Sequence, residues 1–381
     1  MKKNIVILGS TGSIGKSAQA VLEKNKDIFK VKMLVAANDF VSIKKQLKIF
    51  KGSKFYLSNA SKISKKNPKY IEKSELRDFI ASSGVDIVIA AISGSEGLEL
   101  IHHSINSGKR VLIANKEPLV MAGDYLMNLA KKKKAEIIPI DSEHCAVHQC
   151  ISGLDKTNIS KITLTCSGGP FLSWSSNKFK KITPNQALNH PIWKMGKKIS
   201  VDSATLMNKA LEIIEAKYLF SMPKNKIEAI IHPEGVVHAL VELKDRSVLA
   251  SLANPDMRLP IAYGLSQPDA VDSNIKRLNL TDIKSLSFEE VNHDKFPSIN
   301  YAYFALKYER GMPIVLNSAN EVAVDAFLKK EITFDKIFKL IDHTMSNAIK
   351  SNILLSSMSI KNILNLSEEA KILASEIKKK I

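Results

Sequence analysis

Short apolar runs alternate with helix-like stretches through residues 1–145. Six runs occur, at residues 4–8, 31–36, 54–57, 86–92, 110–114 and 136–140. Strands that alternate with helices in this way are typical of a parallel, doubly wound sheet. Because ligands of such sheets bind beyond the carboxyl ends of the strands, the polar residues that follow each run are candidate site residues.

The pattern changes after residue 150. Longer β-like runs at residues 161–166, 227–232, 236–243 and 247–253 surround one strong helical pattern at 205–220. From residue 301 the spacing is mostly helical, at residues 301–310, 319–329, 334–349 and 367–380. The chain is therefore expected to be an α/β protein with a Rossmann-like N-terminal domain, an α+β second domain and a C-terminal helical bundle. The expected boundaries are 1–145, 146–266, a linker at 267–292, and 293–381.

Composition places the chain among ordinary globular proteins. Its 381 residues are 45% hydrophobic and 25% charged, and its cleanest apolar run, 87–92, is far shorter than the ~20 residues of a membrane helix. We expect the first residues to form a β-strand and not a signal peptide, because Gly9 ends the apolar stretch early. Cys145, Cys150 and Cys166 form no Cys-x-x-Cys pair and cannot make a closed disulfide set. A reducing cytoplasm fits these features.

The formal charge of +18 does not by itself indicate a nucleic-acid-binding protein. Only six of the 56 basic residues are arginine, which is the residue favoured for bidentate recognition of phosphates and bases. The densest lysine runs, at 131–134 and 378–380, lie at predicted helix ends, where cations complement the helix dipole. We interpret the charge as solvated surface that speeds the arrival of small anions.

A glycine-rich turn at residues 9–15, Gly-Ser-Thr-Gly-Ser-Ile-Gly, follows the first predicted strand and opens a helix. Backbone N–H groups in this setting hold a pyrophosphate. Thr11 replaces the second glycine of the usual Gly-x-Gly-x-x-Gly pattern, and a simple tight turn is the alternative interpretation. The alternating β/α context favours dinucleotide binding.

The tip of the second predicted strand favours NADP over NAD. Asn38 stands there without the carboxylate that usually accepts the ribose 2′-hydroxyl, and Lys44 and Lys45 could reach a 2′-phosphate. Asp39 is close by and argues for NAD.

Carboxylates follow the last predicted strand of the first domain. In an extended segment Asp141 and Glu143 would project to the same side, as hard oxygen ligands suited to Mg²⁺ or Mn²⁺. The predicted helix at 205–220 would bring Asn208, Lys209 and Glu212 to one face. The competing interpretations are a helix-capping pair at 141–143 and a surface salt bridge between Lys209 and Glu212.

The histidines beside these carboxylates do not form a zinc-protease motif. His144 and His148 lie four apart, but the glutamate precedes them instead of lying between them. We interpret both as ordinary helix residues.

Two further segments could surround a substrate. Ser167-Gly-Gly-Pro ends a β-like run with small residues, so backbone can approach a ligand closely, although glycines also simply turn chains. Ser203, or alternatively Asp202, would cap the predicted helix at 205–220. A helix N-terminus with Ser203, Asn208 and Lys209 would suit a phosphate.

Seven ordered sequence blocks together resemble the 1-deoxy-D-xylulose 5-phosphate reductoisomerase family. They lie at residues 9–15, 114–117, 140–143, 167–171, 190–196, 198–209 and 256–262, and residues 319–322 add an eighth similar segment. The resemblance implies an NADPH-dependent oxidoreductase that also needs a divalent metal, Mg²⁺ or Mn²⁺, with Co²⁺ as a further candidate. It would convert 1-deoxy-D-xylulose 5-phosphate to 2-C-methyl-D-erythritol 4-phosphate for isoprenoid precursors by the non-mevalonate route.

The resemblance also implies roles for individual residues. The implied metal ligands are Asp141, Glu143 and Glu212, which with Lys116 form the catalytic set. The implied substrate contacts are Lys116, Ser142, Glu143, Ser167, His190, Trp193, Met195, Ser203, Asn208, Lys209, Glu212 and His238. The implied cofactor contacts are Gly9, Thr11, Gly12, Ser13, Ile14, Asn38, Asn115, Glu117 and Gly196.

The chain departs from the family pattern at three positions. Ala37 stands where a lysine would be expected, Cys166 where a smaller residue is common, and Ala210 where glycine is common. Only Ala37 bears on a proposed contact, that with the 2′-phosphate.

The implied domains are an NADPH-binding domain, a catalytic and dimerisation domain with a flap, a linker and a helical bundle. We expect residues 190–198 to form a lid, although Trp193 could simply be a core residue. The expected protein is a cytoplasmic homodimer acting on a small phosphosugar, with no nucleic acid or membrane partner. A metal-independent NADP dehydrogenase would explain residues 1–150 but leave the carboxylates without a role.

Overall fold

The computed structural model describes residues 2–94, 97–193, 195–308, 311–354 and 357–381. Residues 309–310 of the predicted helix at 301–310, and Lys194 of the predicted lid, lie outside this part. By contacts the chain divides into two compact units, which are described separately. The first unit comprises Met1–Pro118, Leu126–Cys145 and Asp256–Arg277, and the second comprises Leu119–Tyr125, Ala146–Pro255 and Leu278–Ile381. The division into four domains by role, made from the sequence, stays a prediction.

The first unit contains a six-stranded sheet with the order β3-β2-β1-β4-β5-β6. Its strands are β1 (Lys3–Leu8), β2 (Phe29–Ala36), β3 (Lys54–Leu57), β4 (Ile87–Ala90), β5 (Arg110–Ile113) and β6 (Glu136–Pro139). Every neighbouring pair is parallel, which confirms the predicted doubly wound sheet. The carboxyl ends of β1, β2, β5 and β6 carry the candidate site residues of this unit.

Helices cover both faces of this sheet, because alternate residues of β1 pack into different apolar clusters. Ile5 and Ile7 belong to one cluster, with side chains of α1 (Ser13–Lys24), α2 (Phe40–Ile49) and α11 (Arg258–Ser266), whereas Val6 and Leu8 belong to another, with side chains of α4 (Lys73–Ala81). The helices of this part of the chain are α1 (Ser13–Lys24), α2 (Phe40–Ile49), α3 (Lys62–Lys65), α4 (Lys73–Ala81), α5 (Leu98–Asn106), α6 (Glu117–Lys133), α7 (Ser142–Cys150) and α11 (Arg258–Ser266). The middle of α6 and the end of α7 belong to the second unit.

The second unit has a mixed sheet with the order β10-β9-β7-β8-β11. Its strands are β7 (Ile159–Cys166), β8 (Ile227–Ile231), β9 (Val237–Leu243), β10 (Val248–Leu252) and β11 (Glu289–Glu290). Only β7 and β8 pair in parallel among these strands, as expected of an α+β domain.

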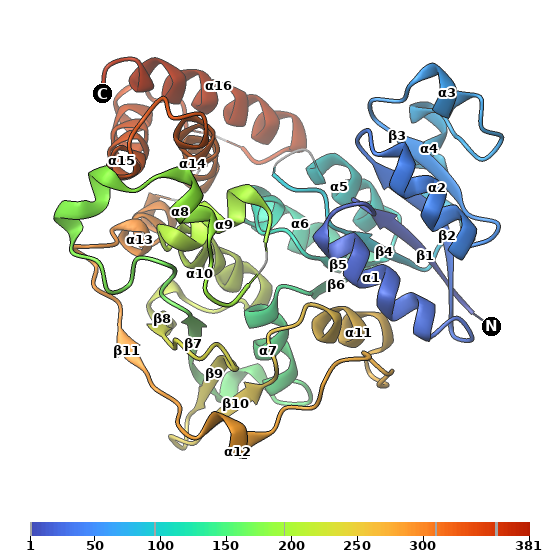
Figure 1. Cartoon of the computed structure of the whole chain (residues 1–381), viewed down its shortest axis with the longest axis horizontal. Helices are drawn as coiled ribbons and strands as arrows, with labels where there is room; N and C mark the ends of the chain where they lie inside the picture. Colours follow the sequence, from blue (N-terminus) through green and yellow to red (C-terminus); the bar gives the residue numbers. More distant parts are fainter. Residues whose placement is uncertain (1, 95–96, 194, 309–310, 355–356) are drawn as a thin grey trace. The chain divides into compact units, whose positions relative to one another are not determined.

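Helices make up the rest of the second unit. They are η2 (Lys156–Asn158), η3 (Ser176–Lys181), α8 (Pro184–Leu188), α9 (Lys197–Ala204), α10 (Met207–Phe220), η4 (Lys224–Lys226), α12 (Leu280–Ile283), α13 (Ser298–Tyr308), α14 (Met312–Leu328), α15 (Phe334–Lys350) and α16 (Ile360–Lys378). Figure 1 shows α14, α15 and α16 packed side by side, which confirms the predicted C-terminal bundle. Of all these helices as described, none is both long and apolar enough to cross a membrane.

The predicted helix at 205–220 is wrong at its start. The structure has α9, which ends at Ala204, and α10, which begins at Met207, with Leu206 between them in a left-handed conformation (φ 58°). The Thr205 hydroxyl donates to the carbonyls of Val201 and Asp202 and accepts from the N–H of Met207. These local bonds replace the helical bonds of a continuous helix and end α9.

Candidate functional site

The glycine-rich turn of the first unit joins β1 to α1. Gly9 has a positive φ of 84°, and a Cβ there would lie 2.2 Å from the carbonyl oxygen of Ala91, so only glycine fits. Gly12 is the N-cap of α1 and no side chain caps it. Gly12 and Ser13 are exposed, and Thr11 and Ile14 are partly exposed. The helix N-terminus is thus accessible to an anion.

The tip of β2 is followed by an exposed amide, that of Asn38, and by a carboxylate, that of Asp39, which already accepts a hydrogen bond from the chain. Asn38 is exposed, while Asp39 accepts the N–H of Ser42 at 2.9 Å and so caps α2. Hydrogen bonds from Ser42 hold the pKa of Asp39 below its usual value. The ammonium of Lys44 lies 5.2 Å from the Phe40 ring centroid. Because Asp39 has a structural role, its presence is a weak argument for a ribose contact.

Lys116 and Asp141 form a buried ion pair beyond β5 and β6. The Lys116 Nζ lies 2.8 Å from Asp141 Oδ2, and His144 Nδ1 lies 3.4 Å from the same oxygen. Burial by itself would raise the pKa of Asp141, but the Lys116 ammonium and His144 outweigh it and hold that pKa well below the usual range. Asp141 is therefore an ionised carboxylate at neutral pH. Asn115 and Glu117 flank Lys116, half-buried and buried respectively.

The prediction that Asp141 and Glu143 lie in an extended segment is wrong. β6 ends at Pro139 and α7 begins at Ser142, so Glu143 stands in the first turn of a helix. A carboxylate oxygen of Glu143 nevertheless lies within 4.8 Å of one of Asp141. The Ser142 hydroxyl donates to Glu143 Oε2 at 2.6 Å. The pair thus offers hard oxygen donors at the start of α7.

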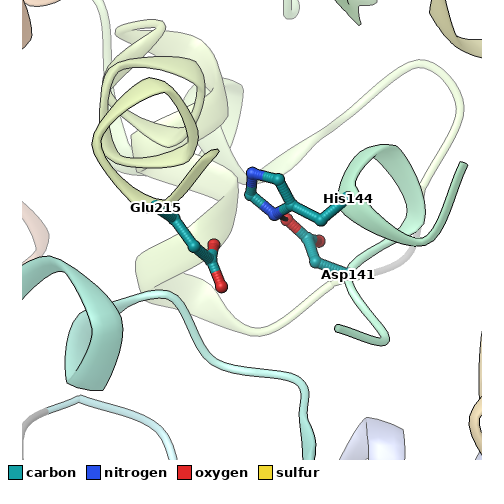
Figure 2. A group of neighbouring side chains, drawn as sticks. All are labelled: Asp141, His144 and Glu215. Carbon is teal, nitrogen blue, oxygen red and sulfur yellow. Dashed lines mark ion pairs between the residues drawn. The ribbon is translucent and has the colours of Figure 1, made fainter. Parts of the chain in front are cut away.

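His144 is the residue of this region that the sequence analysis missed. It was interpreted as an ordinary helix residue, but it is fully buried and pairs with Asp141, as Figure 2 shows. The spacing of three residues from Asp141 to His144 was the available signal, because it brings two side chains to one helix face. Figure 2 also draws Glu215, which comes from α10 of the second unit.

The second unit holds a buried polar cluster on the first turns of α10. Glu212 is fully buried, and its carboxylate accepts from Asn208 Nδ2 at 2.6 Å and forms an ion pair with Lys209. Lys209 is only 1% exposed, so the alternative of a surface salt bridge is wrong. Burying an ion pair costs desolvation free energy, which is repaid only where the geometry is good and further hydrogen bonds satisfy the charges.

Ser167 and His190 are hydrogen-bonded near the end of β7. His190 Nδ1 accepts the N–H groups of Ile192 and Trp193, so its Nε2 carries the proton and donates to Ser167 Oγ at 3.1 Å. Burial lowers the pKa of His190 to about 4, so the ring is neutral at neutral pH. Ser167 Oγ also accepts from Gly169 N–H at 3.3 Å, and its own proton is therefore free to donate to a ligand.

Gly169 brings the Ser167 loop against α9. It has a φ of 69°, and a Cβ there would lie 2.7 Å from the carbonyl oxygen of Ser203. The glycine therefore allows a backbone contact that no side chain would permit. From the sequence, the Ser-Gly-Gly-Pro block predicted that its backbone approaches a ligand closely. It did not predict that this backbone also approaches the backbone of Ser203.

Ser203 is not a helix cap. It lies within the last turn of α9, and the N-cap of α10 is Leu206. Asp202 does not cap α10 either, because its carboxylate accepts from Lys198 and Asn320. The three residues predicted to bind the phosphate therefore lie on both sides of a helix junction, with Ser203 in α9 and Asn208 and Lys209 in α10.

Residues 190–196 of the predicted lid lie between α8 and α9, whereas residues 197–198, predicted to belong to the same lid, form the start of α9. Trp193 and Met195 are partly buried, and Gly196 is the exposed N-cap of α9. The Trp193 ring lies 6.4 Å from the ring of His238, a buried residue of β9. Trp193 is therefore not a fully buried core residue.

Family models match most of the chain. One described as 1-deoxy-D-xylulose 5-phosphate reductoisomerase matches residues 5–123. Two described as C-terminal domains of the same reductoisomerase match residues 137–220 and 252–373.

Named relatives and solved structures show the same similarity. The chain is 44% identical over 353 residues to a 1-deoxy-D-xylulose 5-phosphate reductoisomerase of Endomicrobium trichonymphae, covering 90% of this chain and 91% of the relative. For one from Pelodictyon phaeoclathratiforme the identity is 42% over 351 residues, with 90% and 92% covered. A crystal structure of DOX-P reductoisomerase with NADPH, fosmidomycin and magnesium is 36% identical, has a TM-score of 0.93, and covers 99% of this chain and 98% of its own. The Zymomonas mobilis reductoisomerase with NADPH is 32% identical, with a TM-score of 0.91 and coverages of 100% and 99%.

Proposed function

The chain belongs to the 1-deoxy-D-xylulose 5-phosphate reductoisomerase family, and we propose that it converts 1-deoxy-D-xylulose 5-phosphate to 2-C-methyl-D-erythritol 4-phosphate, with NADPH and a divalent metal. The product would serve isoprenoid precursor synthesis by the non-mevalonate route. The observation that carries the proposal is the presence of two buried lysine–carboxylate ion pairs, Lys116–Asp141 in one unit and Lys209–Glu212 in the other, within a chain of this family.

We propose that Asp141, Glu143 and Glu212 bind the metal. The donor set fits a hard cation such as Mg²⁺, Mn²⁺ or Co²⁺, because all three donors are carboxylates and Asp141 is ionised. A divalent cation bound there would act as a Lewis acid on the hydroxy-ketone oxygens of the substrate. Lys116 would hold Asp141 ionised, and Ser142 would hold Glu143 through its hydrogen bond.

The substrate phosphate would bind to Ser167, Ser203, Asn208 and Lys209. A phosphate accepts hydrogen bonds, and the hydroxyl proton of Ser167 is available because His190 and Gly169 already donate to its oxygen. Lys209 would add a buried positive charge. Holding the phosphate away from the reacting carbons would convert binding energy into orientation.

NADPH would bind to the first unit and supply the hydride. Its pyrophosphate would lie at the N-terminus of α1, near Gly9, Thr11, Gly12, Ser13 and Ile14. We propose that the further contacts are Asn38, Asn115, Glu117 and Gly196.

Residues 190–198 would close over the bound substrate. Trp193 and Met195 would exclude water from the reacting carbons. His190 would hold the backbone of this segment through its hydrogen bonds, and His238 would contact the Trp193 ring. The motivation is the position of His190, which bonds both Ser167 and the backbone that begins the segment.

We propose that the active form is a cytoplasmic homodimer. Val248 and Leu249 are 55% and 36% exposed on β10, an edge strand of the second sheet, and edge strands with apolar residues are commonly covered by a partner. No nucleic-acid partner is expected.

The decisive experiment is NADPH oxidation by the purified full chain. We expect oxidation only when both 1-deoxy-D-xylulose 5-phosphate and Mg²⁺ or Mn²⁺ are present, with one 2-C-methyl-D-erythritol 4-phosphate formed per NADPH.

Two results would contradict the proposal. Turnover that persists after exhaustive chelation would indicate a metal-independent dehydrogenase. Absence of turnover together with a gel shift of nucleic acid at physiological salt would indicate a binding protein.

A further inference from the structure

A buried polar contact joins α9 to the C-terminal helix α14. Asn320 Nδ2 donates to Asp202 Oδ1 at 2.7 Å, and Asn320 and Asp202 are 0% and 2% exposed. Lys198 Nζ pairs with the other carboxylate oxygen, Asp202 Oδ2, also at 2.7 Å. The Asp202 carboxylate, in the last turn of α9, thus binds both the start of α9, through Lys198, and α14, through Asn320, which lies 118 residues further along the chain.

The side chain of Asn320 is oriented by this contact. Its nitrogen must face the carboxylate, because two oxygens would repel each other. Its oxygen has no hydrogen-bond partner among the residues that the structure describes. Since an unsatisfied buried carbonyl is costly, an amide in this place is a poor choice for packing alone.

A second contact from the C-terminal bundle reaches the same junction. Ser298 Oγ, on α13, donates to the carbonyl oxygen of Thr205 at 2.8 Å. Thr205 directly precedes Leu206, whose left-handed conformation is unfavourable for any residue except glycine or asparagine. Such a backbone persists only where its surroundings hold it in place.

This junction determines where the proposed phosphate contacts lie. Asp202 directly precedes Ser203 in α9, and Asn208 and Lys209 stand in the first turn of α10. A small rotation of α9 would therefore change the position of Ser203 relative to Asn208 and Lys209.

We propose that Asp202 and Asn320 are positioning residues, through which the C-terminal bundle fixes the phosphate-binding junction between α9 and α10. The inference rests on the proposed function because the substrate is taken to be the phosphosugar. Binding of inorganic phosphate at the junction can be measured without that assumption. The C-terminal helices thus act on substrate affinity through one hydrogen bond, without contacting the substrate.

The test is an Asn320→Ala variant of the full chain, with Ser318→Ala as the matched control. Ser318 lies on the same helix and is equally buried, but its hydroxyl bonds Ser367 of α16, 2.9 Å away, and not α9. Steady-state kinetics would be measured with the phosphosugar and NADPH, and binding of inorganic phosphate by calorimetry. Should Asn320→Ala fail to fold, Asn320→Ser takes its place, because its shorter hydroxyl cannot reach Asp202.

We expect Asn320→Ala to raise the KM for the phosphosugar and the Kd for inorganic phosphate, each about tenfold. The KM for NADPH should stay within about twofold, and Ser318→Ala should change none of these constants. The Asp202→Asn/Asn320→Asp double variant should bind phosphate more tightly than Asn320→Asp, because it restores an amide–carboxylate pair.

An equal change in both alanine variants, or unchanged phosphate affinity in Asn320→Ala, would overturn the inference. Failure of the proposed function gives a different result. The wild-type chain would then bind phosphate in an Asn320-dependent manner without turning over the phosphosugar.

Discussion

Lys116 Nζ lies 2.8 Å from Asp141 Oδ2, and both side chains are buried beyond neighbouring strands of one sheet. The ammonium offsets the cost of burying the carboxylate and keeps it charged. Asp141 therefore needs no proton loss before it can bind a cation. The chemistry proposed for this chain depends on that pair.

Cofactor choice is expected to depend on Lys45. We predict that NADPH is preferred to NADH, and that Lys45→Ala lowers kcat/KM for NADPH roughly tenfold while leaving that for NADH unchanged. The reason is that the 2′-phosphate, absent from NADH, needs a cation near Asn38, where Ala37 provides none. Lys48→Ala is the control, since Lys48 is also exposed on α2 but lies at its far end. Equal kcat/KM of the wild type with both cofactors would contradict this prediction.

Trp193 is expected to act in closure and not in the core. Trp193→Ala should lower kcat/KM on the order of tenfold or more with little change in melting temperature. Loss of a core tryptophan would instead cost roughly 3–5 kcal/mol. Trp174→Ala provides the comparison, because Trp174 is also partly buried but packs on the buried ring of Phe171, with centroids 5.1 Å apart. A large fall in melting temperature for Trp193→Ala, or unchanged kinetics, would refute the lid.

Gly169 is expected to set the distance between the Ser167 loop and α9. Gly169→Ala should raise the KM for the phosphosugar and destabilise the fold, because the new Cβ would lie 2.7 Å from Ser203 O. Gly153→Ala is a matched control, with a φ of 79° but no atom within 4 Å of the added Cβ. It should cost only the roughly 1–2 kcal/mol of a left-handed backbone and leave KM unchanged. The same KM in both variants would show that the contact does not matter for binding.

His190 is expected to make folding stability depend on pH. Its folded pKa of about 4 lies below its ordinary value of 6.5, so the unfolded chain binds more protons between these limits. Stability from this group is fully present above about 6.5 and is lost as the pH falls toward about 4. The free energy of unfolding of wild type minus that of His190→Asn should therefore grow as the pH rises through this window.

The strands of the first unit could be predicted from the sequence nearly residue by residue. The run at 54–57 coincides with β3, and the other five end within two residues of the observed strands. Buried parallel strands leave such a strong signal because their apolar runs are continuous and bounded by polar turns.

The helix junction at Leu206 could not be predicted in this way. Residues 205–220 have unbroken helical spacing, but the break depends on bonds from Thr205 and Ser298, the latter 93 residues away. Apolar periodicity contains no information on such bonds. The same holds for the contact between Asp202, which was predicted as an alternative helix cap, and Asn320, to which the sequence assigned no partner.

The central claim is that Asp141, Glu143 and Glu212 together bind the catalytic metal. The most direct measurement is Mn²⁺ binding, followed by electron paramagnetic resonance, in wild type, Asp141→Asn, Glu143→Gln and Glu212→Gln. Glu228→Gln is the control, since Glu228 pairs with Lys161 on the second sheet, away from these clusters in sequence. We predict that each of the three variants stays folded, binds Mn²⁺ far more weakly and loses at least about a hundredfold in kcat/KM at limiting metal, while the control does neither. Wild-type Mn²⁺ affinity and turnover in any of the three would remove that residue from the site and contradict the account.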